Sequence, residues 1–237
     1  MEVDYQKLSE QYASFLVAAG GVSITVLALV LTLGTETGEK ELRTFLAAAL
    51  IVATISSFTG AHMLSETASF ISYSKGTQTP LSGERLFVLA SINIYISVIV
   101  ILFALMLLPK ASGRVDAAIR PISVSVFVFA LTAVLCWMVF SITIRFPRLS
   151  GWRAILMIIA IFCLDGLWGY LLYQFKDRLL LLSFIPILIL ILISLVSFTR
   201  AFKLDGEAHK LDVVFFVLAV TFSCVSLTAA AIKLMLR

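Results

Sequence analysis

Charged residues are scarce in this chain. Only 14% of the residues are charged and 61% are hydrophobic, whereas a typical soluble domain is about 25% charged and roughly 45–50% apolar. The mean hydropathy is +1.07. These values exclude a water-soluble monomer and indicate a protein embedded in a lipid bilayer.

The chain also lacks a basic patch, although its formal net charge is +4. Lysine and arginine occur singly or in twos and threes between apolar runs, whereas a nucleic-acid surface requires them to cluster on one face. We therefore expect no nucleic-acid partner. The basic residues instead flank helix ends at the lipid headgroups.

Cysteine and histidine are too few and too scattered to build a disulfide framework or a metal centre. The three cysteines, Cys136, Cys163 and Cys224, fall in three different apolar runs and form no CxxC pair. A haem held by two histidines would need both of them in the spans, but His209 lies in a loop and only His62 lies in a run. We expect no metal and no cofactor.

No complete catalytic motif is present in the 237 residues. The HExxH pattern of metalloproteases, the GxSxG pattern of serine hydrolases and the Walker motif of nucleotide-binding proteins are all missing. These absences argue against an enzyme. An enzyme that modifies lipids within the membrane through Asp165 and His62 remains an open alternative.

Seven apolar runs are long enough to cross a bilayer. A hydrocarbon core about 30 Å thick requires about 20 apolar helical residues, because backbone N–H and C=O groups must pair within the segment. No gap between the runs is long enough for a soluble domain. The predicted fold is therefore all-α, a single polytopic membrane domain over residues 1–237 with about seven spans. The runs cover 15–33, 45–64, 86–108, 121–144, 154–173, 179–198 and 213–232.

The connections between the runs constrain their arrangement. Only residues 174–178 lie between the fifth run and the sixth, so we expect these two spans to be antiparallel neighbours. The longest connection, 65–85, contains in its first half the residues ETASFISY, which could continue the second helix beyond the membrane. The leader of the first run is more acidic than basic, unlike a cleavable signal peptide, so we expect that run to remain as a span.

The number of spans predicts the relative sides of the termini but not the orientation. An odd number of spans places the two termini on opposite sides of the membrane. Orientation normally follows from an excess of lysine and arginine on the cytoplasmic side, but the 18 basic residues of this chain divide equally between the two sides. We assign no orientation.

Asp165 is the residue with the strongest functional implication, because it lies near the middle of the fifth run with no basic residue nearby in sequence. An ionised carboxylate at the centre of a membrane helix costs about 2.5–3.5 kcal/mol on insertion scales, and such a group normally faces a water-filled cavity or a polar partner. We consider two roles for it. One is an ion or proton site on a pathway, and the other is a hydrogen-bonded carboxyl that joins span five to a neighbouring helix.

A second polar group lies at the end of the second run, where Thr59, His62 and Glu66 share one helical face. His62 and Glu66 are four residues apart and can touch. A histidine beside a carboxylate suits a pH gate or a cation site at the mouth of a pore. The alternative is an interfacial histidine and a helix-end glutamate that only meet lipid headgroups.

Asn93 and Trp168 could belong to the same site as Asp165. Asn93, four residues before Ser97 in the third run, could complete a polar site with Asp165 or form a hydrogen bond across a helix interface. Trp168 follows Asp165 by about one turn and could line the same cavity or only pack against a neighbouring helix. Serine and threonine in the seventh run are weak evidence for a polar pathway, because their hydroxyls can bond to the preceding turn.

Two functions fit these residues. The first is transport by a small ion channel or ion-coupled carrier, with Asp165 on the pathway and Asn93, His62, Glu66 and Thr59 as further candidates. The second is a non-conducting membrane subunit or scaffold, whose polar residues only hold helices together and which acts through partner proteins.

The expected partners follow from the same composition. They are the lipid bilayer, a small ion or solute for the transport function, and further copies of this chain, since the sixth run is apolar on all sides. The compact loops and the lack of an N-glycosylation sequence fit a prokaryotic plasma membrane, so we expect a multi-pass cell-membrane protein.

Overall fold

All the described secondary structure of this chain is α-helical. The computed structural model describes residues 4–32, 40–74, 83–111, 122, 124–134, 136, 163, 166–171, 174, 179–201 and 210–236. Within these residues no strand occurs, and five helices are long and apolar enough to cross a membrane. The prediction of an all-α, polytopic membrane bundle is confirmed.

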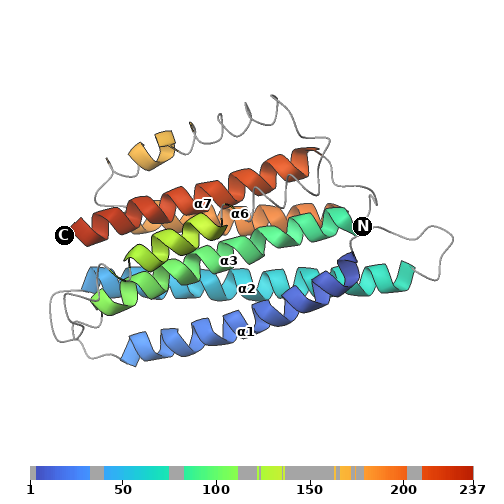
Figure 1. Cartoon of the computed structure of the whole chain (residues 1–237), viewed down its shortest axis with the longest axis horizontal. Coiled ribbons are helices and arrows are strands. Elements are labelled where there is room, and N and C mark those ends of the chain that lie inside the picture. Colours follow the sequence, from blue (N-terminus) through green and yellow to red (C-terminus); the bar gives the residue numbers. More distant parts are fainter. Residues whose placement is uncertain are drawn as a thin grey trace.

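The five long helices form an elongated bundle (Figure 1). Helices α1 (Tyr5–Thr32), α3 (Glu84–Ala111) and α7 (Lys210–Leu236) run in one direction, whereas α2 (Lys40–Ser74) and α6 (Leu179–Ala201) run in the opposite one. The start of α1 and the end of α7 lie at opposite ends of the bundle (Figure 1), as an odd number of spans requires. Because α3 ends and α6 begins at the same end, an even number of crossings fits between them.

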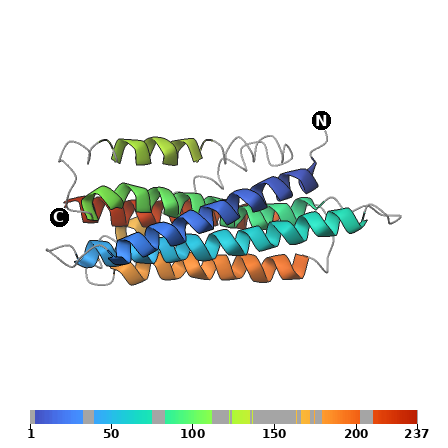
Figure 2. The same ribbon diagram turned by 90° about the horizontal axis from the view of Figure 1, so that it is seen from below.

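The fourth and fifth predicted runs are helical wherever the structure describes them. A shorter apolar helix, Val124–Val134, belongs to the fourth run, and residues 166–171 of the fifth run are helical. The other residues of these two runs lie outside the described part of the chain. Figure 2 shows Val124–Val134 along one side of α3 and α6 along the other. Phe103 of α3 accordingly contacts both Phe127 and Phe184, with ring centroids 6.5 and 6.4 Å apart.

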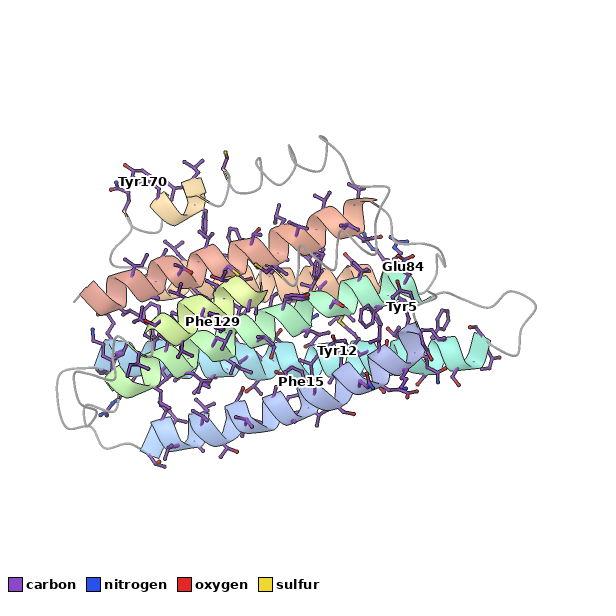
Figure 3. The ribbon with its side chains drawn as sticks, in the orientation of Figure 1. Tyr5, Tyr12, Phe15, Glu84, Phe129 and Tyr170 are labelled. Atoms are coloured by element: carbon purple, nitrogen blue, oxygen red, sulfur yellow. The ribbon has the colours of Figure 1, made fainter. Side chains whose placement is uncertain are left out.

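Helix α1 begins at Tyr5, well before the apolar run that was predicted to start at residue 15. Asp4 caps the helix, because its Oδ1 accepts a hydrogen bond from the Lys7 backbone N–H at 3.1 Å. Tyr5 and Tyr12 point from α1 towards α3 (Figure 3), where their rings contact Phe87 at 5.5 and 6.1 Å. These contacts bury one face of a leader that hydropathy alone marks as polar.

Helix α2 continues through residues ETASFISY to Ser74, so the suggested extension of the second helix is present. Its last turns pack against Gly83, which precedes α3 and has φ of 63°. A Cβ at Gly83 would lie 2.2 Å from Ile71 Cδ1. Glycine is therefore needed here both for the left-handed backbone and for the close contact.

Helix α3 is the central helix and α1 is peripheral. In the most apolar window of α3, 78% of the residues are buried, compared with 22% in α1. Helix α3 also contacts each of the other four long helices. A polar residue on α3 is therefore surrounded by protein rather than by lipid.

Candidate functional site

A buried polar cluster joins α2, α3 and α6 inside the bundle. Ser56 Oγ of α2 donates a hydrogen bond to the backbone oxygen of Asn93 at 2.9 Å. The Asn93 Nδ2 amide donates to Ser194 Oγ of α6 at 2.9 Å and to Met63 Sδ of α2 at 3.3 Å. All four side chains are fully enclosed. These four residues are named the Asn93 cluster below.

Small residues on α2 bring the helices close enough for these bonds. A Cβ added at Gly60 would lie 2.8 Å from Asn93 Cβ and 2.7 Å from Leu16 Cδ1, so glycine is required where α1, α2 and α3 meet. The Ser57 and Ser97 hydroxyls form a further hydrogen bond between α2 and α3. Small residues and hydroxyls at close interfaces are a common means of joining membrane helices.

The Asn93 cluster uses its hydrogen-bonding groups internally. Both Nδ2 hydrogens of Asn93 have an acceptor, namely Ser194 Oγ and Met63 Sδ. Ser194 Oγ in turn donates to the Ile191 backbone oxygen at 2.7 Å. A buried network whose members are satisfied makes the core rigid. The cluster therefore leaves no amide hydrogen of Asn93 available to a passing ion or solute.

The chemistry of the Asn93 cluster is that of a helix contact. An amide, two hydroxyls and a thioether do not exchange protons near neutral pH. No group of three His, Cys, Asp or Glu side chains that could hold a metal occurs among the residues described by the structure. Of the two roles considered for Asn93, an interhelical hydrogen bond is the one that the geometry supports.

His62 and Glu66 lie apart from the Asn93 cluster, on the exposed face of α2, and Thr59 is half-buried nearby. Within the described residues no hydrogen bond or ion pair joins His62 to Glu66. The structure therefore places these three residues apart from Asn93, although the sequence had suggested that all four belong to one pathway. The same face of α2 carries the exposed apolar residues Ile51, Ile55 and Phe58.

Asp165 lies outside the described residues, but residues 166–171 follow it and pack against α7. Trp168 Nε1 donates a hydrogen bond to Ser226 Oγ at 3.0 Å. The Trp168 ring also contacts Phe222, with ring centroids 5.2 Å apart. Helix α7 is thus a direct neighbour of the fifth run, which no feature of the sequence had indicated.

Residues 166–171 pack closely against α7. Of the described α7 hydroxyls, Ser226 is the one bonded to these residues. A Cβ added at Gly169 would lie 3.1 Å from Val225 Cγ1, so the two helices approach tightly at this glycine. Thr221 and Ser223 bond back to backbone oxygens of their own helix at 2.9 and 2.7 Å, as expected for membrane serine and threonine. Ser226 differs because it binds a side chain of another helix.

An ion pair that the sequence interpretation missed joins the starts of α3 and α7. Arg85 Nε lies 2.9 Å from Asp212 Oδ2, and the two side chains are 16% and 10% exposed. At the other end of the same helices, Lys110 Nζ donates to the Leu234 backbone oxygen, where the helix dipole favours a cation. A signal was present, since Arg85 and Asp212 carry opposite charges at the starts of two spans predicted to begin on the same side.

Comparison of the chain with protein-family models, with curated proteins and with solved structures finds no match. The class of the protein therefore follows from its fold. Its long apolar helices and buried interhelical hydrogen bonds are those of a polytopic α-helical membrane protein.

Proposed function

We propose that this membrane protein transports a small ion or solute, as a small channel or an ion-coupled carrier, and that Asp165 is an ion or proton site on its pathway. Ionisable residues inside membrane spans are costly, and they typically mark ion pathways or proton relays. The observation that carries the proposal is the hydrogen bond from Trp168 to Ser226. It sets the chain three residues beyond Asp165 directly against α7.

In this proposal the pathway runs beside α7, and the Asn93 cluster belongs to the fixed part of the bundle. The amide hydrogens of Asn93 are occupied and its side chain is enclosed. The parallel helices α3 and α7 are joined at both ends, by the Arg85–Asp212 ion pair and by the Lys110 contact to α7. Such a pair supplies a fixed wall beside the described residues 166–171 of the fifth run.

His62 and Glu66 have a separate role in the proposal, as a pH-sensitive pair near one end of the bundle. Thr67, which follows Glu66, packs near Gly83 at the start of α3, so this part of α2 lies at the level where α3 begins. Both side chains lie on the outer surface of the bundle. Thr59, one turn before His62 on α2, is the remaining candidate on this helix.

A non-conducting subunit or scaffold is the second candidate, and the Asn93 cluster favours it. The buried polar groups of this cluster bond to neighbouring helices or to their own helix, which is the behaviour of residues that only hold helices together. Under this alternative Asp165 is also a helix contact and the protein acts through partners. Both candidates are non-enzymatic.

The proposed environment is a prokaryotic plasma membrane in which several copies associate. The outer surface of the bundle is strongly apolar, which suits contact with lipid or with further copies equally well. In α6 the exposed apolar residues include Ile185, Leu188, Ile189, Leu192, Ile193 and Val196.

The test compares two substitutions of Asp165 in purified protein reconstituted into liposomes. Asp165→Asn keeps the shape and hydrogen bonding of the side chain but removes its charge, whereas Asp165→Leu removes both. If Asp165 is a pathway site, Asp165→Asn should change the flux or selectivity for Na⁺, K⁺, H⁺ or Cl⁻ while thermal stability and oligomeric state stay unchanged. Ser223→Ala is a matched control, because Ser223 is buried in α7 and bonds only to its own helix.

The two candidates predict opposite patterns. If Asp165 only joins helices, Asp165→Asn should leave flux untouched and Asp165→Leu should lower stability by about 0.6–2 kcal/mol, the range for a membrane hydrogen bond. Normal flux in a well-folded Asp165→Asn protein would remove Asp165 from the pathway. No flux of any of these ions in the wild-type protein would favour the scaffold instead.

A further inference from the structure

Helix α6 contains a buried hydroxyl without a partner next to a carbonyl that a proline deprives of its usual donor. Pro186 lies inside α6 and has no N–H, so the Leu182 carbonyl loses the donor that it would have four residues later. The Ser183 hydroxyl is fully buried and has no hydrogen-bond partner among the residues that the structure describes. Because Leu182 and Ser183 are consecutive, a carbonyl without its usual helical donor and a hydroxyl without a partner lie at the same level of one helix.

The described side chains near Ser183 offer it no polar partner. Its neighbour Phe184 contacts the rings of Phe45 on α2 and Phe103 on α3, at 5.9 and 6.4 Å. Ser183 lies on the same face of α6 as the buried residue Ile187 and as Ser194, so this face points into the bundle. A hydroxyl buried there without a hydrogen bond pays its full desolvation cost.

Other fully buried serines show that the environment of Ser183 is unusual. Ser194, Ser223 and Ser97 each make a hydrogen bond to a backbone oxygen or to another hydroxyl. Ser9 of α1 also lacks a partner within the described part of the chain, but no proline frees a carbonyl beside it. Ser183 is distinguished by having a freed carbonyl next to it.

We propose that one water molecule is bound at this point of α6, donating a hydrogen bond to the Leu182 carbonyl and accepting one from Ser183 Oγ. Buried waters normally satisfy polar groups that lack other partners. Prolines are tolerated in membrane helices where hydroxyl side chains and ordered waters satisfy the freed backbone groups. A hard cation such as Ca²⁺ would need about six to eight oxygen ligands, and two neutral oxygens do not provide them.

This water site is independent of the proposed transport function. It gives a role to the serine that lies three residues before a proline in an apolar helix, and it makes the two residues act as a unit. The water replaces the hydrogen bond that Pro186 removes, and Ser183 holds that water in place.

The test is a double-mutant cycle on the full-length purified protein, read by thermal unfolding. Ser183→Ala should lower the melting temperature by about 2–4 °C, the shift that corresponds to one lost interaction in a chain of this size. Pro186→Ala restores an N–H to the Leu182 carbonyl and removes the need for the water. In the Pro186→Ala background, Ser183→Ala should therefore cost much less.

Ser223→Ala is the matched control, because it deletes a buried hydroxyl that bonds back to its own helix, and its melting temperature should change little. An unchanged or raised melting temperature for Ser183→Ala would overturn the proposal, since deleting a dry, unsatisfied hydroxyl costs nothing. Equal losses in both backgrounds would also overturn it. If Pro186→Ala does not fold, experimental density decides: a peak within hydrogen-bond distance of both Ser183 Oγ and the Leu182 oxygen supports the water, and its absence refutes it.

Discussion

Arg85 Nε lies 2.9 Å from Asp212 Oδ2, and this ion pair joins the first turn of α3 to the first turn of α7. The two helices are parallel, and at their other ends Lys110 binds the backbone of α7. Between these contacts Tyr95 meets Phe216 edge-to-face at 5.2 Å. These three contacts hold α3 and α7 together along their length.

The first prediction concerns this ion pair. Asp212→Asn should lower the free energy of unfolding by at least about 1–3 kcal/mol, the cost of leaving a buried polar group without its partner, because it leaves a mostly buried guanidinium without its counter-charge. The measurement is chemical or thermal unfolding in detergent. Lys7→Gln is the control, since Lys7 is exposed and its loss should be nearly neutral.

Exchanging the two charges distinguishes an interaction between Arg85 and Asp212 from separate contributions of each residue to stability. The double variant Arg85→Asp with Asp212→Arg should recover part of the stability lost in Asp212→Asn. If the exchanged pair is no more stable than the single variant, the 2.9 Å contact contributes little.

A second prediction concerns the Asn93 cluster. Asn93→Ala removes the amide bonds to Ser194 and Met63 and should cost about 0.6–1.7 kcal/mol for each bond lost. In the Asn93→Ala background, Ser194→Ala should change the stability little, because the hydrogen bond between the two side chains is already lost. Ser56→Ala should remain costly there, because Ser56 bonds to the backbone oxygen of residue 93.

Flux decides whether Asn93 also serves a pathway. The transport proposal expects ion flux through a folded Asn93→Ala protein to match the wild type. Abolished flux with intact folding would return Asn93 to the pathway.

The third prediction compares Gly83, which is closely packed and has a left-handed backbone, with Gly21, which has open space beside it. Gly83→Ala should destabilise the protein by at least about 1–2 kcal/mol, the cost of a left-handed backbone for alanine, with the contact to Ile71 adding to it. Gly21→Ala should instead stabilise it by roughly 0.5–1 kcal/mol, because Gly21 is helical and a Cβ there meets nothing within 4 Å. Unfolding midpoints of the two variants measured side by side test both signs.

The fourth prediction concerns His62. If His62 and Glu66 form a functional pair, wild-type flux should vary between roughly pH 5 and 8, where histidine changes its charge. His62→Ala should flatten that profile, and Glu66→Gln should alter it. A wild-type flux that is constant over this range would instead leave both residues as surface groups that only meet headgroups.

Several features of the fold could be predicted from the sequence because they depend on local properties. The length of an apolar run reports whether a helix can cross the bilayer, since each span must satisfy its own backbone groups. The continuation of α2 into ETASFISY was visible for a similar reason, because no helix breaker interrupts it. The helical leader of α1 was missed, because its stability comes from Tyr5 and Tyr12 packing on Phe87 of another helix.

Hydrophobic length is a property of each segment alone, so the class of this protein, an all-α polytopic membrane bundle, could be predicted from its amino acids. Which polar residues meet could not be predicted in this way, because it depends on the folded bundle. Asn93 binds Ser194, which lies 101 positions later in the chain, and Arg85 pairs with Asp212 through the parallel packing of α3 and α7. Polarity marks a residue as needing a partner, but the partner depends on which helices pack together and at what level, and that is a property of the whole bundle.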